Sequence, residues 1–97
     1  MKHSYELSLQ AQDDLMDIFI FSIGEFGVDQ AEKYRDGLLK LLDQLVEFPF
    51  EGISRPEINK DVRSMVYVSH TIYYSIGTSK LFIERILHQS RDTPAHF

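Results

Sequence analysis

The sequence predicts an α+β domain in which a short N-terminal strand precedes an antiparallel two-helix hairpin and then three antiparallel strands. Two patterns carry this prediction. Apolar residues recur at helical spacing from Leu9 to Glu47 with a break at Gly27, and three later runs alternate between apolar and polar residues. We expect the helix hairpin to cover one face of the sheet and the other face, with aromatic and basic groups, to stay partly open.

The first expected element is a strand over His3–Ser8, because Tyr5 and Leu7 alternate with polar residues there. Ser8 is then placed as the N-cap of a helix, since its hydroxyl can accept a hydrogen bond from the first helical turn.

The two expected helices span Leu9–Phe26 and Val28–Glu47, and both show apolar stripes at helical spacing. Gly27 between them is suited to a left-handed C-cap, and Pro49 ends the second helix. Gly37 is unfavourable inside a helix, so we expect another part of the chain to cross closely there.

The remaining chain predicts a loop followed by two hairpins. The loop covers Phe48–Asp61, and the three strands cover Val62–Val68, His70–Gly77 and Lys80–His88. The links between the strands are short, as in consecutive antiparallel hairpins.

Composition indicates one domain, residues 1–97, because 97 residues and 11.3 kDa are the size of a single domain. The formal net charge of -5 argues against a general nucleic-acid binder. No apolar run approaches the roughly 20 residues that span a bilayer, and we expect no secretory signal. Without cysteine there is no disulfide, thiolate metal site or cysteine nucleophile, so a cytoplasmic protein without a cofactor is expected.

Charge is distributed unevenly along the chain. Residues 1–60 carry 6 basic and 12 acidic side chains, whereas residues 61–97 carry 4 basic and 3 acidic ones. A surface for an anionic target is therefore expected in the C-terminal part. The acidic residues Asp13, Asp14 and Asp17 are interpreted as complements to the dipole of the first helix. The four histidines lack the spacing of a preformed metal site.

One set of C-terminal residues could support chemistry on a phosphodiester. It consists of Arg63, Tyr67, His70, Tyr73, Arg85, His88 and Arg91. Metal-independent RNA cleavage needs a base, an acid and cations for the transition state, which His88 and the two strand arginines could supply. The alternative is structural: Arg85 pairs with Glu84 or with an acid on a neighbouring strand, and His88 ends a strand half buried.

Several short segments together resemble the ParE branch of the RelE/ParE toxin superfamily, over almost the whole chain. They are Leu7-Ser8, Asp14-Leu15 with Asp17-Ile18, Phe26-Gly27-Val28, Phe48-Pro49, Val62-Arg63-Ser64, Tyr73-Tyr74 and Arg85–Asp92 with Pro94-Ala95-His96. The resemblance implies a type II toxin that a ParD-like antitoxin neutralises, and ParE relatives inhibit DNA gyrase. RelE-like relatives instead cut mRNA on the ribosome, commonly with a tyrosine near the C-terminus.

Two observations favour the ParE branch over the ribonuclease branch. No tyrosine follows His88, and a chain of net charge -5 is poorly suited to docking in ribosomal RNA. The expected function is therefore a non-catalytic gyrase inhibitor, whose target contacts are Arg63, Arg85, His88 and Arg91. The alternatives are a ribosome-dependent mRNA endonuclease and an interaction protein without toxicity that only stabilises its partner.

The resemblance also implies a hetero-oligomeric complex with a ribbon-helix-helix antitoxin. In that complex the chain would be held on operator DNA only through the antitoxin. A disordered antitoxin tail could lay an amphipathic helix on the toxin or add a strand to its sheet. Candidate contacts are Ile20, Ile23 and Tyr34 on the flanks of the helices, unless these three residues simply widen the core.

Overall fold

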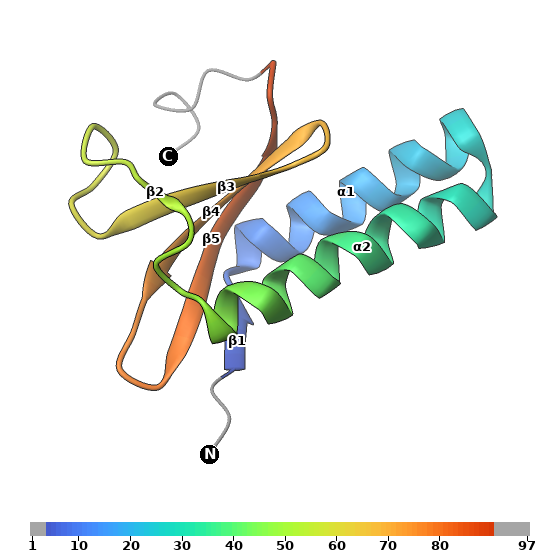
Figure 1. Ribbon diagram of the computed structural model, residues 1–97. Helices are drawn as coiled ribbons and strands as arrows, with labels where there is room; N and C mark the ends of the chain where they lie inside the picture. The colour runs from blue at the N-terminus through green and yellow to red at the C-terminus, as the bar shows by residue number, and fades with distance from the viewer. Residues whose placement is uncertain (1–3, 91–97) are drawn as a thin grey trace.

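The structure is a computed structural model that describes residues 4–90 (Figure 1). Its elements are β1 (Ser4–Leu7), α1 (Leu9–Phe26), α2 (Val28–Glu47), β2 (Ile53–Ser54), β3 (Val62–Tyr67), β4 (His70–Ile76) and β5 (Lys80–His88). The predicted α+β class and the order of its main elements are confirmed. The predicted N-terminal strand ends one residue earlier than expected, because Ser8 leaves the sheet; its expected first residue, His3, lies outside the described residues.

A single five-stranded sheet has the order β1-β5-β4-β3-β2. β1 pairs with β5 in parallel, and every other neighbouring pair is antiparallel. The first and last strands of the described chain are therefore neighbours, and β5 lies between β1 and the hairpin strand β4.

The predicted loop Phe48–Asp61 contains the short strand β2, which was not predicted. Ile53 and Ser54 pair with Ser64 and Arg63 of β3. Two residues are too few to show a period-2 pattern, so β2 had no sequence signal. The predicted strand ends also move inward by one residue, because Val68 adopts a positive φ of 51° and Gly77 belongs to the turn before β5.

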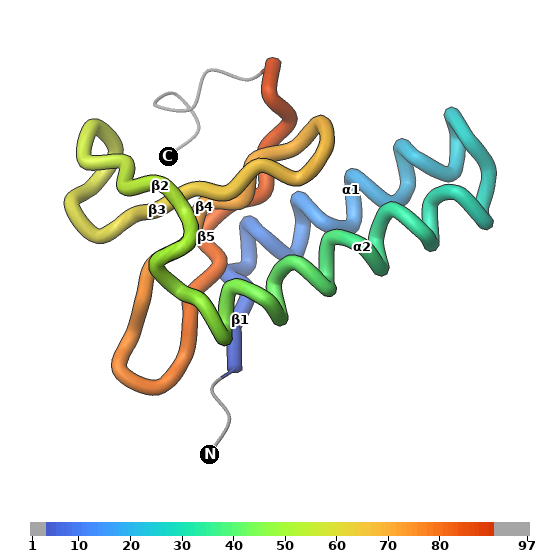
Figure 2. The backbone as a smooth tube through the Cα atoms, viewed as in Figure 1, coloured from blue at the N-terminus to red at the C-terminus, as the bar shows by residue number. Residues whose placement is uncertain are grey.

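Both helix boundaries follow the predicted capping residues. The Ser8 hydroxyl accepts the backbone N–H of Ala11 at 3.0 Å. Gly27 has φ 88°, which favours glycine, and it ends α1 and precedes α2. The resulting turn between the helices is tight, and the helices lie side by side and extend beyond the sheet (Figure 2).

The main core lies between the helices and one face of the sheet. α2 contributes Leu38, Leu42 and Leu45, all fully buried. The other buried members are Ala11 and Ile18 of α1 and Ile72, Tyr74, Leu81, Ile83 and Ile86 of the sheet. The apolar stripes seen in the sequence face this core, and the removal of their side chains from water stabilises the fold.

The opposite face of the sheet is partly covered by the chain's own loop. Val62, Tyr73 and Leu87 are only 6%, 4% and 3% exposed there, and Ile58 of the loop packs against them. The Arg55 guanidinium lies 5.6 Å from the centre of the Tyr73 ring. The face expected to be open is thus closed at its middle, because the loop after β2 folds back across it.

Gly37 does mark a close approach, although its neighbour comes from the sheet. A Cβ added at this position would collide with the hydroxyl of Tyr67 on β3. The absence of a side chain at Gly37 therefore lets the ring of Tyr67 reach α2.

The described helices include none that is both long enough and apolar enough to cross a membrane.

Tyr74 ties the loop after α2 to the centre of the sheet, which makes Tyr74→Phe a test of this link. Its buried hydroxyl donates to the Pro49 carbonyl at 2.8 Å and accepts the Gly52 N–H at 3.0 Å. Tyr74→Phe leaves the Gly52 amide without this acceptor, so we expect about 1–3 kcal/mol lower free energy of unfolding in urea. Tyr5→Phe, at a half-buried ring of β1, is the control and should change it by less than about 0.5 kcal/mol. Equal losses for the two variants would contradict this account.

Candidate functional site

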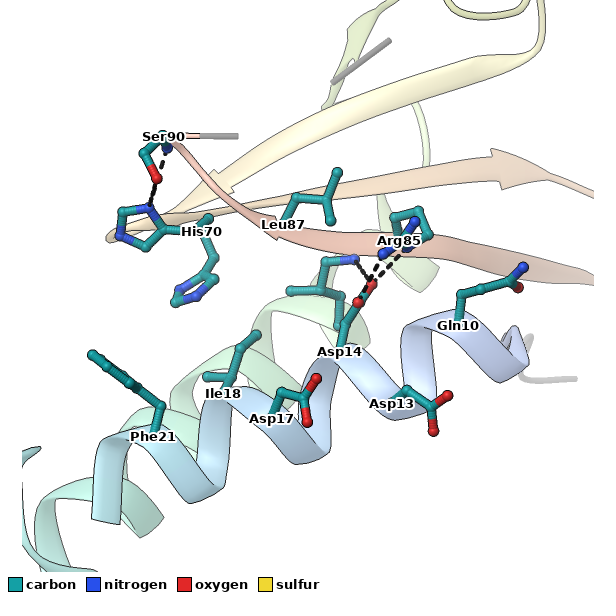
Figure 3. Close-up of a pocket in the computed structure, with 12 residues that line it drawn as sticks. Gln10, Asp13, Asp14, Asp17, Ile18, Phe21, His70, Arg85, Leu87 and Ser90 are labelled. Atoms are coloured by element: carbon teal, nitrogen blue, oxygen red, sulfur yellow. Dashed lines mark hydrogen bonds and ion pairs between the residues drawn. The ribbon is translucent and has the colours of Figure 1, made fainter. Parts of the chain in front are cut away.

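A concave region lies between α1 and the C-terminal half of β5 and extends to α2 and the turn between β3 and β4. Two adjoining cavities of about 640 Å³ and 670 Å³ share Phe21, His70 and His88, and together we call them the α1–β5 groove. Figure 3 shows the first cavity, between the side chains of α1 and the strand above it.

The groove exists because β1 covers only part of the β5 edge. β1 pairs with β5 as far as Ile83, and the Ser8 N–H then donates to the Ile83 carbonyl at 3.0 Å. The Ser8 hydroxyl donates to the Glu84 carbonyl at 2.7 Å and also caps α1. The chain leaves the sheet at this point, so α1 rather than a strand lies beside the rest of β5.

Arg85 and Asp14 connect α1 to this part of β5. Nε and Nη2 of Arg85 donate to the two carboxylate oxygens of Asp14 at 2.8 and 3.0 Å, and the Ile86 N–H donates to the same carboxylate at 3.0 Å. The two side chains are only 19% and 14% exposed. The hydrogen bond to Asp14 raises the pKa of Arg85, while burial opposes that change. Figure 3 shows Asp14 pointing from α1 toward Arg85.

A β-bulge accompanies this contact. Tyr73 of β4 is opposite Arg85, whereas the next residue, Tyr74, is opposite Ile83, so Glu84 is the extra residue. Glu84 accepts the Ser75 hydroxyl at 2.9 Å. Bulges re-aim the side chains beside them, and this one accompanies the turn of Arg85 toward α1.

The predicted partner of Arg85 was therefore wrong, and the predicted role of Asp14 was incomplete. Arg85 pairs with an acid of α1 instead of Glu84 or an acid on a neighbouring strand, and Asp14 does more than complement a helix dipole. A sequence signal was available, because Asp14 lies three residues after Ala11 and four before Ile18 on the buried side of α1. An acid at such a position needs a partner.

A polar network of aromatic and imidazole groups forms the end wall of the groove. The Tyr34 hydroxyl lies 2.8 Å from Nδ1 of His70 and 3.3 Å from the Tyr67 carbonyl, and it accepts the Ser69 N–H at 3.3 Å. The rings of His70 and His88 meet edge to face, 5.3 Å apart between centres. Burial lowers the pKa of His70, the nearby His88 lowers it further, and Asp14 opposes the change.

His88 lies at the exposed end of β5. Its Nδ1 accepts the Ser90 N–H at 3.1 Å and lies 2.8 Å from the Ser90 hydroxyl. Accepting a backbone N–H requires Nδ1 to be without a proton, so neutral His88 carries its proton on Nε2. The expectation of a half-buried ring is wrong, because His88 is exposed.

The second cavity is mostly apolar. Its walls include Phe21 and Phe26 of α1, Tyr34 of α2, and Val68 in the turn between β3 and β4. Phe21, Phe26 and Val68 are 65–67% exposed, which is high for such large apolar side chains. An apolar hollow of this kind accommodates aliphatic or aromatic groups of a partner.

The residues predicted to meet an antitoxin separate in the structure. Tyr34 of α2 lines the groove, whereas Ile20, which is 59% exposed, and Ile23, which is half buried, lie on the side of α1 away from the core. The three residues do not form one patch.

The residues predicted to meet a target also separate. Arg63 lies at the far side of the sheet, where its Nη1 donates to the Gly52 carbonyl at 2.8 Å and its guanidinium lies 4.9 Å from the centre of the Phe50 ring. Arg85 and His88 both line the first cavity. Arg91 lies outside the described residues.

The chemistry of the first cavity is acidic. Asp13 and Asp17 line it together with Asp14, and Arg85 is its single arginine. Within residues 4–90, no group of three or more histidine or acidic side chains is arranged to hold a metal ion. Since Asp14 already neutralises Arg85, the cavity has a negative balance that disfavours binding of a phosphate group.

The Asp14–Arg85 pair gives a stability prediction. Asp14→Asn leaves the guanidinium without its counter-charge in a mostly buried position, so we expect the free energy of unfolding to fall by about 2–4 kcal/mol. The double variant Asp14→Asn/Arg85→Met should recover most of this loss, because it removes both charges and keeps an amide oxygen that can accept the Ile86 N–H. Asp36→Asn, which breaks the exposed pair with Arg35, is the control and should cost less than about 1 kcal/mol. A double variant no more stable than Asp14→Asn would contradict the assignment.

The low pKa of His70 gives a pH prediction. Below its ordinary pKa of 6.5, the unfolded chain binds a proton at this position more readily than the folded chain does. The contribution of His70 to stability is thus complete above pH 6.5 and decreases as the pH falls below that value. Urea unfolding at about pH 7.5 and about pH 5.5 should show a smaller loss on acidification for His70→Gln than for the unchanged chain. An identical loss in both proteins would be the contrary result.

Known proteins resemble this chain in sequence and fold. Residues 5–93 match the family described as "ParE toxin of type II toxin-antitoxin system, parDE". The chain is 34% identical over 92 residues to Toxin ParE1 of Caulobacter vibrioides, covering 95% of each chain. It is also 34% identical over 93 residues to Toxin ParE1 of Mycobacterium tuberculosis, again covering 95% of each.

A solved structure described as "Chromosomal ParDE TA system from P. aeruginosa" shares the fold, with a TM-score of 0.77 and 19% identity. The similarity covers 90% of this chain and 96% of that one. Since the family match and the sequence relatives extend over nearly the whole chain, the protein belongs to the ParE toxin family of type II toxin–antitoxin systems.

Proposed function

We propose that this toxin acts in the cytoplasm by binding DNA gyrase without catalysis, and that a ParD-like ribbon-helix-helix antitoxin neutralises it. Membership of the ParE family supports gyrase as the target, in line with the resemblance seen in the sequence. A solved structure of the same fold is described as a ParDE system, which supports an antitoxin as partner.

The observation that carries non-catalytic action is the bidentate Asp14–Arg85 pair. Electrostatic catalysis at a phosphodiester requires a cation directed at the developing negative charge. The Arg85 guanidinium instead faces Asp14 at 2.8 and 3.0 Å, and two further carboxylates line the same cavity. This arrangement favours binding over an mRNA endonuclease of the RelE type.

The target surface is proposed at the C-terminal end of β5. His88 is exposed there, beside the groove, and Arg91 follows three residues later in the sequence. Arg85 supports this end of β5 through Asp14, and Arg63 lies on β3 against the loop after α2. We propose all four residues as contributors to target binding, with His88 and Arg91 making the direct contacts.

The antitoxin is proposed to contact Ile20, Ile23 and Tyr34 within a hetero-oligomeric complex. Tyr34 would be reached through the apolar part of the groove and the two isoleucines along α1. Operator DNA would be bound only through the antitoxin, because α1 and α2 carry nine acidic and three basic residues.

Removal of the C-terminal segment tests whether target binding and neutralisation by the antitoxin use different parts of the toxin. Removing residues 91–97 leaves the contacts of Gln89 and Ser90 in place, since Gln89 donates to the Ser69 carbonyl and Ser90 contacts His88. We expect the truncated chain to lose inhibition of gyrase supercoiling and growth arrest while still co-purifying with its antitoxin. The matched point variants are His88→Ala and, as a control, Lys40→Ala on the exposed side of α2.

Two results would contradict this function. One is a truncated chain that inhibits supercoiling like the full chain, which would remove the C-terminal segment from the target surface. The other is cleavage of mRNA in a translating extract together with unchanged gyrase activity, which would favour the endonuclease.

A further inference from the structure

The outward side of α1 carries a row of exposed aliphatic side chains. Leu9, Met16 and Ile20 are 77%, 60% and 59% exposed, and Ile23 continues the row half buried. The buried residues of α1, Ala11, Ile18 and Ser22, lie on the opposite side of the helix. We call the row Leu9, Asp13, Met16, Ile20 and Ile23 the α1 seam.

The spacing of the α1 seam is that of a helix-packing surface. Its members follow one another at intervals of four, three, four and three residues. This is the a/d repeat through which one helix packs against another at a crossing angle of about 20°. The seam extends about 21 Å along α1, given a rise of about 1.5 Å per residue. Such a row accommodates about two heptads of one further helix.

Charge specifies the kind of helix that fits. α1 contains the acidic residues Asp13, Asp14, Asp17 and Glu25 and no basic residue. Asp13 lies within the seam, and both Asp13 and Asp17 are exposed. A second copy of this chain would bring a further set of carboxylates to the seam, and its α1 has no basic residue to pair with them, which is repulsive. A helix with Lys or Arg beside its apolar stripe would pair with them.

We propose that the α1 seam binds an amphipathic helix of the antitoxin whose apolar stripe is flanked by basic residues. The inference rests on the proposed antitoxin partner and adds the chemistry of the segment that it uses. It assigns Leu9 and Met16 to the same surface as Ile20 and Ile23. This surface borders the α1–β5 groove, which Asp13 also lines, but it does not include Tyr34. Both helices extend beyond the sheet, so a helix can lie along the hairpin (Figure 1).

Two synthetic peptides test the chemistry directly on the full-length toxin. Each has about three heptads with Leu at a and d; one has Lys at e and g, and the other has Glu. Fluorescence anisotropy should show the Lys peptide binding at least about tenfold more tightly than the Glu peptide, with the difference shrinking as salt is added. Circular dichroism should show the bound peptide gaining helix.

Variants distinguish the seam from general attraction to an acidic protein. Met16→Asp and Ile20→Asp should each weaken Lys-peptide binding at least about tenfold, because each places a charge in the apolar contact. Ile53→Asp is the matched control, since Ile53 is 72% exposed on β2 outside the seam, and its binding should stay unchanged. Asp13→Lys/Asp17→Lys should reverse the preference in favour of the Glu peptide.

The inference is overturned if both peptides bind equally or if neither binds. It is also overturned if light scattering shows that the unchanged chain is a dimer and that the Ile20→Asp variant is a monomer. Co-expression with the antitoxin separates this failure from that of the proposed function. If the antitoxin neutralises and co-purifies with Ile20→Asp as with the unchanged toxin, the seam is not its docking surface although the proposed function stands. If no antitoxin neutralises the unchanged toxin, the proposed function itself fails.

Discussion

The arrangement of α1 on the sheet depends on one carboxylate that the fold cannot leave without partners. Asp14 lies on the inner side of α1 and accepts three hydrogen bonds, two from Arg85 and one from the Ile86 N–H. A mostly buried charge is tolerated only when it is paired and hydrogen-bonded in this way. The contact holds α1 beside the stretch of β5 that β1 does not reach, and so it determines where the α1–β5 groove opens.

The same arrangement gives α1 two chemically different accessible surfaces. One borders the groove, where carboxylates, the His70–His88 pair and the aromatic rings gather. The other is the α1 seam, which is aliphatic and acidic. A toxin that meets both a target and an antitoxin can use distinct surfaces for them, and a single 18-residue helix borders both.

Local signals predicted most of the fold. Ser8 and Gly27 fixed the helix ends through side-chain capping and positive φ, and alternation located β3, β4 and β5. The strand β2 was not predicted, because two residues are too few to show a pattern. The packing of the loop residue Ile58 against Tyr73 was not predicted either, because the path of a loop has no periodic signal in the sequence. These features depend on contacts between distant segments.

The candidate site was predicted less well for the same reason. Residue types drew attention to Arg85, His88 and His70, which line one cavity in the structure, yet the partner of Arg85 lies 71 residues away on a helix. Tyr34 was noted as a helix flank, but its bond to His70 depends on the turn between β3 and β4. Side-chain partners across such separations follow from the tertiary arrangement and not from spacing along the chain.

The parallel pairing of β1 with β5 has a consequence for biosynthesis. The helix hairpin consists of local contacts and can form while the chain is still being made. The edge of β1 has no neighbour until residues 80–83 have been translated, and the wall of the groove requires residues up to 88. A nascent toxin therefore lacks its finished surface until residue 88 has been translated, and translation interrupted before that point yields fragments that cannot assemble it.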